Sequence, residues 1–177
     1  NAIDRIIGGL ERKNKIITPQ EKKTIAYHEA GHATVSWVLE HANPLIKVTI
    51  IPRGKALGAA WYLPEERQIT TKEQMLDEMT PSFVKNERAS ILGGRASELM
   101  NFGMVSTGAL NDLERVTKQA YAMVAYYGMS EQLGNRSFYD STGQADMALT
   151  KPYSEMTAQQ IDDEVKKLID GAFARAL

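Results

Sequence analysis

His28 and His32 lie one helical turn apart, with Glu29 between them, in the stretch "TIAYHEAGHATVSWVLE". On an α-helix the two imidazoles project about 40° apart on one face, so both can bind the same metal ion. Glu29 projects about 100° from His28 and about 60° from His32, beside the ion and poorly placed to be a ligand. It is better placed to take a proton from water. This H-E-x-x-H pattern predicts a zinc site with Glu29 as the general base.

The site needs a third protein ligand, because catalytic zinc is typically held by three side chains and keeps one position open for water. The chain has no cysteine, which excludes a thiolate. His41 is expected to be a helix-end residue instead of a ligand. The metzincin spacing would need glycine and histidine where Val35 and Val38 stand. A downstream carboxylate is therefore expected, and spacing alone leaves these open: Asp77, Glu78, Glu87, Glu98, Asp112 and Glu114.

The alternative interpretation of the motif is a helix with two hydrogen-bonded core histidines. The sequence has 3 histidines, and two of them fall within this one short motif, which favours metal binding. Taken by itself, Asp112 would be interpreted as an acidic residue that stabilises the N-terminus of a helix.

Composition limits the other classes of function. The 177 residues suffice for one domain with a sizeable core. The 21 basic and 22 acidic residues form no basic block, so a nucleic-acid partner is not expected. No run approaches the roughly 18 apolar residues of a membrane span, and no signal peptide is visible. No segment matches the phosphate-binding motif G-x-x-x-x-G-K-[ST].

The helix that carries the motif is expected over residues 19–40. Thr18 can cap it, Pro19 suits the first helical position, and Glu21 completes a capping box. The residue before Pro44 is disfavoured in a helix, so "HANP" should end it. Two short extended runs follow, "LIKVTIIPRG" and "LGAAWYLP", and they predict a small β-hairpin.

The rest of the sequence is helical by period, so the expected fold is mainly α. Thr70 with Glu73, and Thr157 with Gln160, match the capping pattern at two helix starts, and a long helix should run from about residue 109 to Gly128. The Gly-Gly pair in "SILGGRASE" indicates a close approach of another element or a break. The last helix has an apolar stripe, for which packing within the chain is favoured over self-association: Ile161, Val165, Leu168, Ile169 and Ala172.

Seven segments also occur in a characteristic order: "RIIGGLE", "AYHEAGHA", "VTIIPRG", "LGAAWYLPEE", "GGRASE", "STGALNDLERVT" and "YGMS". In this order they resemble the peptidase domain of FtsH-type proteases, which are membrane-anchored, ATP-dependent zinc metalloproteases of bacteria, mitochondria and chloroplasts. The resemblance covers nearly the whole chain. It implies a helical zinc-peptidase domain over residues 19–177 that binds Zn²⁺ and cleaves unfolded or damaged polypeptides.

The resemblance also narrows the site. It implies that the Asp of "STGALND", Asp112, is the third ligand. Glu98 of "GGRASE" is expected to support the site, although Leu99 stands where the family usually has a second Glu. The second extended run is expected to bind substrate through main-chain pairing along its edge. The alternative for this run is an ordinary hairpin strand over the core. Its residues are Gly58, Ala59, Ala60, Trp61 and Tyr62.

Other expectations concern a longer protein. Residues 1–18 resemble a linker or helix tail that would follow an ATPase module, and that module would bind the ATP. The family implies a homohexamer and a membrane anchor outside this sequence, with the peptidase domain in the cytosol, the mitochondrial matrix or intermembrane space, or the chloroplast. Residues 80–92 are longer than the corresponding family segment and are expected to form a surface excursion, because they are charged and contain Pro81.

Two other functions use the same motif. One is a proteolytically inactive scaffold ring of the same family, but a scaffold would have no use for Glu29. The other is a purely structural zinc domain, but structural sites usually fill all four positions with Cys or His.

Overall fold

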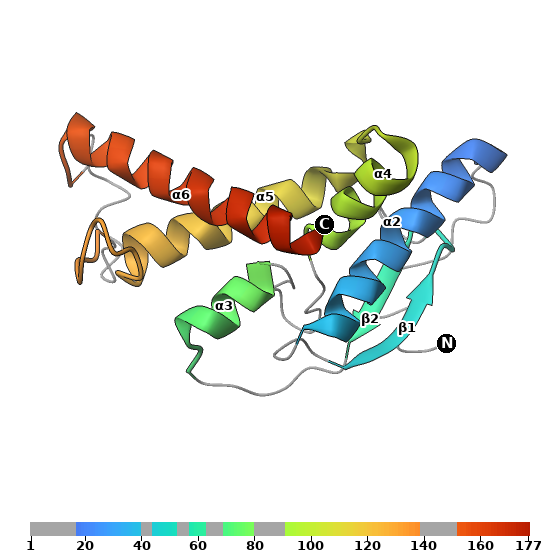
Figure 1. The fold of residues 1–177 in the computed structure, drawn as a ribbon, viewed down its shortest axis with the longest axis horizontal. Helices are drawn as coiled ribbons and strands as arrows, with labels where there is room; N and C mark the ends of the chain where they lie inside the picture. Colours follow the sequence, from blue (N-terminus) through green and yellow to red (C-terminus); the bar gives the residue numbers. More distant parts are fainter. Residues whose placement is uncertain (1–16, 40–43, 53–56, 63–68, 80–90, 139–151) are drawn as a thin grey trace.

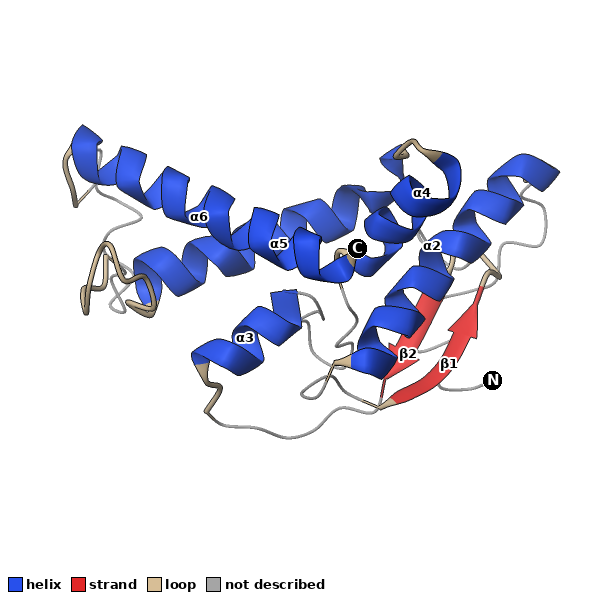
Figure 2. Cartoon of the chain, viewed as in Figure 1, coloured by secondary structure: helices blue, strands red, loops and turns tan. Residues whose placement is uncertain are grey.

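The computed structural model describes residues 17–39, 44–52, 57–62, 69–79, 91–138 and 152–177 (Figure 1). The predicted mainly α fold with one small hairpin is confirmed (Figure 2). No helix in these ranges is both long enough and apolar enough to span a membrane. The elements are α2 (Pro19–Val38), β1 (Leu45–Thr49), β2 (Ala59–Tyr62), α3 (Lys72–Met79), α4 (Gly93–Phe102), η1 (Thr107–Ala109), α5 (Leu110–Tyr121), η2 (Ala122–Tyr126) and α6 (Glu155–Ala176).

Helix α2 begins with the predicted capping box. The backbone N–H of Glu21 donates to the Thr18 hydroxyl at 3.2 Å, and the Thr18 N–H donates to the Glu21 carboxylate at 2.9 Å. The helix ends at Val38, two residues before the predicted end, because Leu39 is already extended. His41 lies in the part that the structure does not describe.

The hairpin is antiparallel, with Thr49 opposite Ala59 and Val48 opposite Ala60. Its two strands differ in burial, since Ala60, Trp61 and Tyr62 of β2 are buried and β1 is mostly exposed. Helix α2 packs against this hairpin (Figure 1). Gly58, just before β2, lies against the side chain of Glu29 in the H-E-x-x-H motif.

Two predicted helix starts are wrong by a few residues. In α3 the capping box is formed by Thr71 and Gln74, each of which accepts a hydrogen bond from the backbone of the other, and not by Thr70 and Glu73. Either threonine fits the sequence pattern, so only the hydrogen bonds distinguish them. In α6 the cap is Ser154, whose hydroxyl accepts from the Thr157 N–H. Thr157 therefore lies inside the first turn.

The main core lies between α5 with η2 and α6, and α3 closes one side (Figure 1). The apolar stripe of α6 is used here: Ile161 and Ala172 are buried, and the other three members pack against the same clusters. The favoured use of the stripe, packing within the chain, is therefore confirmed.

Ile91 and Leu92 each expose only 1% of their surface in this core. The expected surface excursion is thus wrong for the last two residues of the segment 80–92, because they are large apolar side chains next to α4. The remainder of that segment is outside the ranges described.

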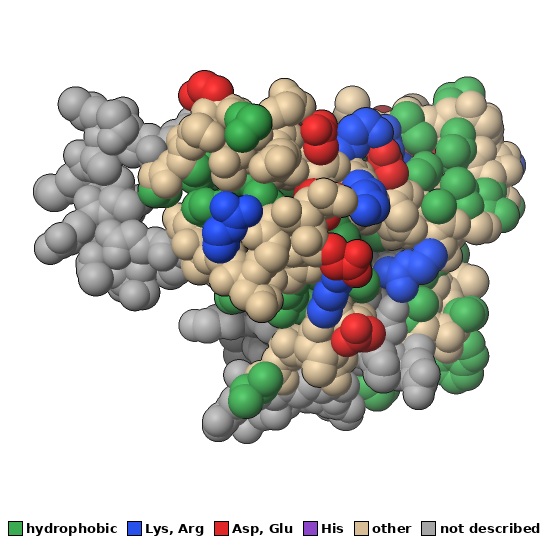
Figure 3. Space-filling model, turned by 60° about the vertical axis from the view of Figure 1, so that its left-hand side comes forward, with side chains coloured by type: hydrophobic (Ala, Val, Ile, Leu, Met, Phe, Trp, Pro, Cys, Tyr) green, Lys and Arg blue, Asp and Glu red, His purple; other side chains and the backbone are tan. Residues whose placement is uncertain are grey.

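Charges are mixed on the face shown in Figure 3, where basic and acidic side chains alternate among apolar ones and no histidine is visible. This face carries no extended basic patch. The histidines of α2 lie in the interior, as their burial shows.

Candidate metal centre

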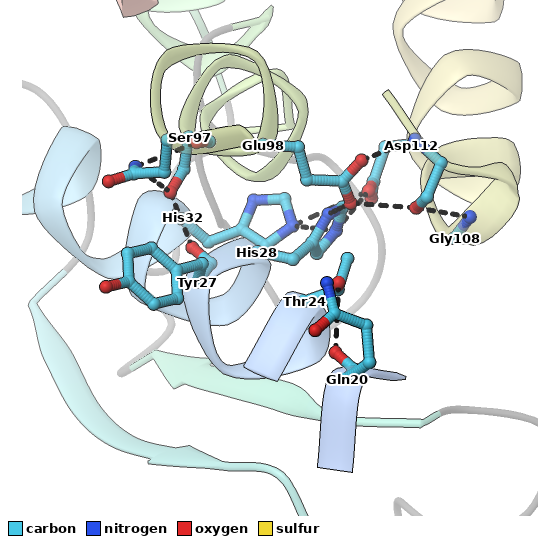
Figure 4. Close-up of polar contacts among 11 residues, drawn as sticks. Gln20, Thr24, Tyr27, His28, His32, Ser97, Glu98, Gly108 and Asp112 are labelled. Atoms are coloured by element: carbon cyan, nitrogen blue, oxygen red, sulfur yellow. Dashed lines mark hydrogen bonds and ion pairs between the residues drawn. The ribbon is translucent and has the colours of Figure 1, made fainter. Parts of the chain in front are cut away.

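Three side chains from two helices converge on one point. His28 and His32 project from the same face of α2, with their Nε2 atoms 2.9 Å apart. Asp112, in the first turn of α5, places Oδ2 at 3.2 Å from His28 Nε2 and 3.5 Å from His32 Nε2. Figure 4 shows these three side chains. Both histidines are buried and Asp112 is largely covered.

The size of this triangle fits zinc. Four-coordinate zinc with bonds of about 2.0–2.1 Å to nitrogen and oxygen separates neighbouring ligand atoms by about 3.3 Å. The three separations of 2.9, 3.2 and 3.5 Å bracket that value. Among the residues that the structure describes, the group that could hold a metal consists of these three side chains. Three protein ligands leave one position for water or substrate.

Of the other carboxylates named from the sequence, the structure describes the side chains of Glu98 and Glu114, and of these two Glu98 contacts a histidine. Glu114 lies on the exposed side of α5 and pairs with Lys118 one turn along. The side chains of Asp77 and Glu78 and the whole of Glu87 are outside the described part.

Glu98 of α4 holds His28 from the side opposite to the triangle. It exposes only 1% of its surface, and the Nδ1 atom of His28 lies 2.7 Å from its Oε1. With the proton on Nδ1 donated to this carboxylate, Nε2 keeps its lone pair for a metal ion.

Glu98 also ties down the chain that leads to Asp112. The Ser106 N–H donates to Oε2 at 2.6 Å, and the Ser106 hydroxyl donates to Oε1 at 2.9 Å. The same hydroxyl accepts from Gly108 N–H at the start of η1. One buried carboxylate therefore fixes the orientation of His28 and the start of the segment that presents Asp112. Ser106 was not identified from the sequence, although serine before a helix is a capping signal.

The electrostatics of the centre favour a charged aspartate. Burial by itself would raise the pKa of Asp112, but hydrogen bonds and charge from His28 and His32 hold it well below its usual value. Burial lowers the pKa of His28, yet the hydrogen bond and charge of Asp112, the charge of Glu29 and the hydrogen bond of Glu98 together raise it. The centre is thus an anionic environment that attracts a cation.

Glu29 is buried on α2 beside this group and does not belong to the ligand triangle. Its charge acts on His28, and its carboxylate lies against Gly58 at the entrance to β2. Glu29 thus lies beside the ligand group without being part of it, and its role as the general base stays a prediction.

Helices α2 and α4 approach so closely that glycine is required on both. A Cβ on Gly31 would overlap the carbonyl oxygen of Gly93, and a Cβ on Gly94 would lie 2.5 Å from Nε2 of His28. A further link is the Ser97 hydroxyl, which donates to the Tyr27 carbonyl of α2 at 2.7 Å (Figure 4). Of the two explanations offered for the Gly-Gly pair, close approach is confirmed. The pair begins α4 and does not interrupt it.

The contact at Gly94 predicts that Gly94→Ala weakens zinc binding. The added methyl group would displace the imidazole of His28, and disturbing the orientation of a ligand typically costs about 10- to 100-fold in metal affinity. Competition with a chromophoric chelator measures the affinity. Gly171→Ala, where a Cβ meets nothing within 4 Å, is the matched control. An unchanged zinc affinity in a folded Gly94→Ala protein would contradict this reason for the glycine.

The chain is similar to known zinc metalloproteases over nearly its whole length. The profile of peptidase family M41 matches residues 15–177. The chain is 65% identical over 176 residues to "ATP-dependent zinc metalloprotease FtsH" of Parabacteroides distasonis, covering 99% of this chain and 24% of that protein. It is 54% identical over 176 residues to "Mitochondrial inner membrane m-AAA protease component AFG3L2" of Mus musculus, covering 99% of this chain and 21% of that protein.

A third relative is "ATP-dependent zinc metalloprotease FtsH" of Rhodothermus marinus, 54% identical over 177 residues, with 99% of this chain and 24% of that protein covered. The chain thus spans about a quarter of the length of the relatives it matches. Since the family profile extends over nearly the whole sequence and the residues of the H-E-x-x-H motif converge with Asp112, this chain belongs to peptidase family M41.

Proposed function

We propose that this chain is a zinc-dependent endopeptidase domain that hydrolyses peptide bonds of unfolded or damaged polypeptides. The observation that carries the proposal is the convergence of His28, His32 and Asp112 at ligand–ligand distances that suit zinc. The printed names of the relatives, which include "zinc metalloprotease", support it.

His28, His32 and Asp112 would hold the ion, and Glu98 would keep His28 in the tautomer that can bind it. When bound, zinc supplies an electrophile that polarises a peptide carbonyl and makes water acidic enough to lose a proton near neutral pH. Glu29 accepts that proton and then delivers it to the leaving nitrogen. Because Glu29 is buried next to the ligands, bulk water has little access to its carboxylate and competes little with it for the proton.

Substrate is proposed to lie along Gly58 and the strand β2 that follows it. Main-chain pairing with a strand edge holds an extended peptide with little demand on its side chains. Gly58 and Ala59 are half-buried, whereas Ala60, Trp61 and Tyr62 are buried. Exposure therefore favours the beginning of this strand as the part that meets the peptide, and the buried remainder also serves the core.

In the longer proteins of this family, an ATPase module would unfold substrates and deliver them to this domain. We propose a homo-oligomer, with six copies as the expected number, attached to a membrane through a segment outside this sequence. The printed names support the ATPase module and the membrane attachment, since one relative is called "ATP-dependent" and another an inner-membrane protease component. An inactive scaffold ring is the second candidate, but the buried Glu29 beside the ligand group favours the active enzyme.

The test is cleavage of casein, which is loosely folded, by the zinc-loaded chain. A chelator is expected to stop cleavage and added Zn²⁺ to restore it, with one zinc per chain by metal analysis. A stably folded substrate should resist with or without ATP, because the sequence has no phosphate-binding motif. Cleavage that persists after zinc removal, or a zinc-loaded protein that never cleaves casein, would contradict the proposal.

A further inference from the structure

Gly58 lies directly against the side chain of Glu29. A Cβ built on Gly58 would be 2.6 Å from Oε1, 2.7 Å from Cγ and 2.9 Å from Cδ of Glu29. These separations are shorter than real Cβ contacts, so the carboxylate occupies the space that any other residue would fill. Gly58 immediately precedes β2, whereas Glu29 is on α2. The contact therefore joins the H-E-x-x-H helix to the hairpin.

Backbone conformation does not explain this glycine. Among the residues that the structure describes, the glycines with positive φ are Gly103, Gly128 and Gly134. Gly58 is not one of them, so its backbone is open to ordinary residues. Glycine is therefore needed at this position because it has no side chain, and not because its backbone is flexible.

We propose that Gly58 is a positioning residue for the general base, a role that rests on the proposed peptidase function. Its bare Cα lets the Glu29 side chain lie directly against the residue that precedes β2. An added methyl group would push the carboxylate away by several tenths of an ångström, because real Cβ contacts below about 3.0 Å do not occur. The Glu29 side chain can rotate about its bonds, so we expect the fold to tolerate this shift. A general base, however, must stay within hydrogen-bond reach of the proton it takes.

The contact also relates the position of the general base to the position of the bound peptide. If the peptide pairs with the start of β2, then the backbone that aligns the substrate is the backbone that limits the carboxylate. The distance between the base and the scissile bond would then depend on the contact between Gly58 and Glu29.

Gly58→Ala tests this proposal in the zinc-loaded protein, with Gly171→Ala as the control, since a Cβ on Gly171 meets nothing within 4 Å. For Gly58→Ala we expect full zinc content, an unfolding temperature close to that of the parent, and kcat lower by about 10- to 100-fold, as for other small misplacements of reacting groups. KM for casein and for a fluorogenic peptide should change less than threefold. A crystal structure of the variant should show the Glu29 carboxylate displaced from its position in the parent.

A double-mutant comparison separates positioning from simple obstruction of the substrate. In a Glu29→Gln background, adding Gly58→Ala should leave the small remaining rate unchanged within twofold, because the base through which Gly58 acts is already lost. A raised KM with unchanged kcat would show instead that the methyl group blocks the peptide, and would overturn the proposal.

Unchanged kcat, or a Glu29 carboxylate that has not moved, would overturn it as well. Failure of the peptidase function itself is seen separately, as a parent protein that does not cleave casein. In that case the crystallographic position of Glu29 in Gly58→Ala still decides whether Gly58 sets its place.

Discussion

Replacing Glu29 by glutamine is expected to abolish peptide-bond cleavage while the protein keeps its zinc. The amide has nearly the same shape, so the buried space beside His28 stays filled. It cannot accept a proton from water or deliver one to the leaving nitrogen. General acid–base catalysis by a positioned side chain typically contributes about 10²- to 10⁴-fold, and here one group would serve both transfers. We therefore expect kcat/KM to fall by a factor near the upper end of that range.

The measurement is casein and fluorogenic-peptide hydrolysis, with zinc content determined on the same samples. Glu114→Gln is a suitable control, because Glu114 is an exposed acid on α5 whose ion pair with Lys118 contributes little to stability. It should retain the parent activity. A Glu29→Gln protein that cleaves as fast as the parent would remove Glu29 from the mechanism, whereas loss of its zinc would show that Glu29 also supports the ligands.

The parts of the site that sequence could predict are those encoded by local spacing. The two imidazoles share a face because they are one turn apart in a single helix, and the helix start follows from Thr18 and Glu21 alone. Such features need no knowledge of the fold. The capping residues of α3 and α6 were nevertheless predicted wrongly, because two candidate caps stand close together in each case. These are the adjacent threonines before α3, and Ser154 and Thr157 before α6.

Long-range partners could not be derived in this way. Asp112 is far along the chain from the histidines, and six carboxylates fitted the sequence equally well until the family resemblance chose one. What places Asp112 is tertiary: Glu98 on α4 binds both His28 and Ser106, and Ser106 leads into the segment that precedes α5. The periodicity of the sequence does not reveal these hydrogen bonds.

The glycines show a third case, in which the signal was visible but ambiguous. The Gly-Gly pair indicated either a close approach or a break, and the answer depended on what faces it. The structure puts His28 against Gly94 and Glu29 against Gly58. At both glycines a side chain of the H-E-x-x-H motif fills the space that a Cβ would need. A glycine in an ordinary backbone conformation is thus informative here, since only packing can explain it.

The second large effect is expected at Asp112. Asp112→Ala should lower zinc affinity by at least about 100-fold, more than disturbing an outer hydrogen-bond partner of a ligand, which typically costs about 10- to 100-fold. Two histidines would remain, and catalytic zinc normally needs three protein ligands. The charge would also be lost, and the pKa of Asp112, held low by the two histidines, shows that its anionic form is the one stabilised here. Activity should fall with zinc content.

Equilibrium competition with a chelator of known affinity would measure the effect, and Glu114→Ala, two residues further along α5, is the control for helix stability. Asp112→Asn separates charge from shape, because it keeps one carbonyl oxygen near the position of Oδ2 and should bind zinc with intermediate affinity. If Asp112→Ala holds zinc as tightly as the parent, another carboxylate completes the site. Glu98 would then be the one to examine, because its Oε1 lies 2.7 Å from Nδ1 of His28.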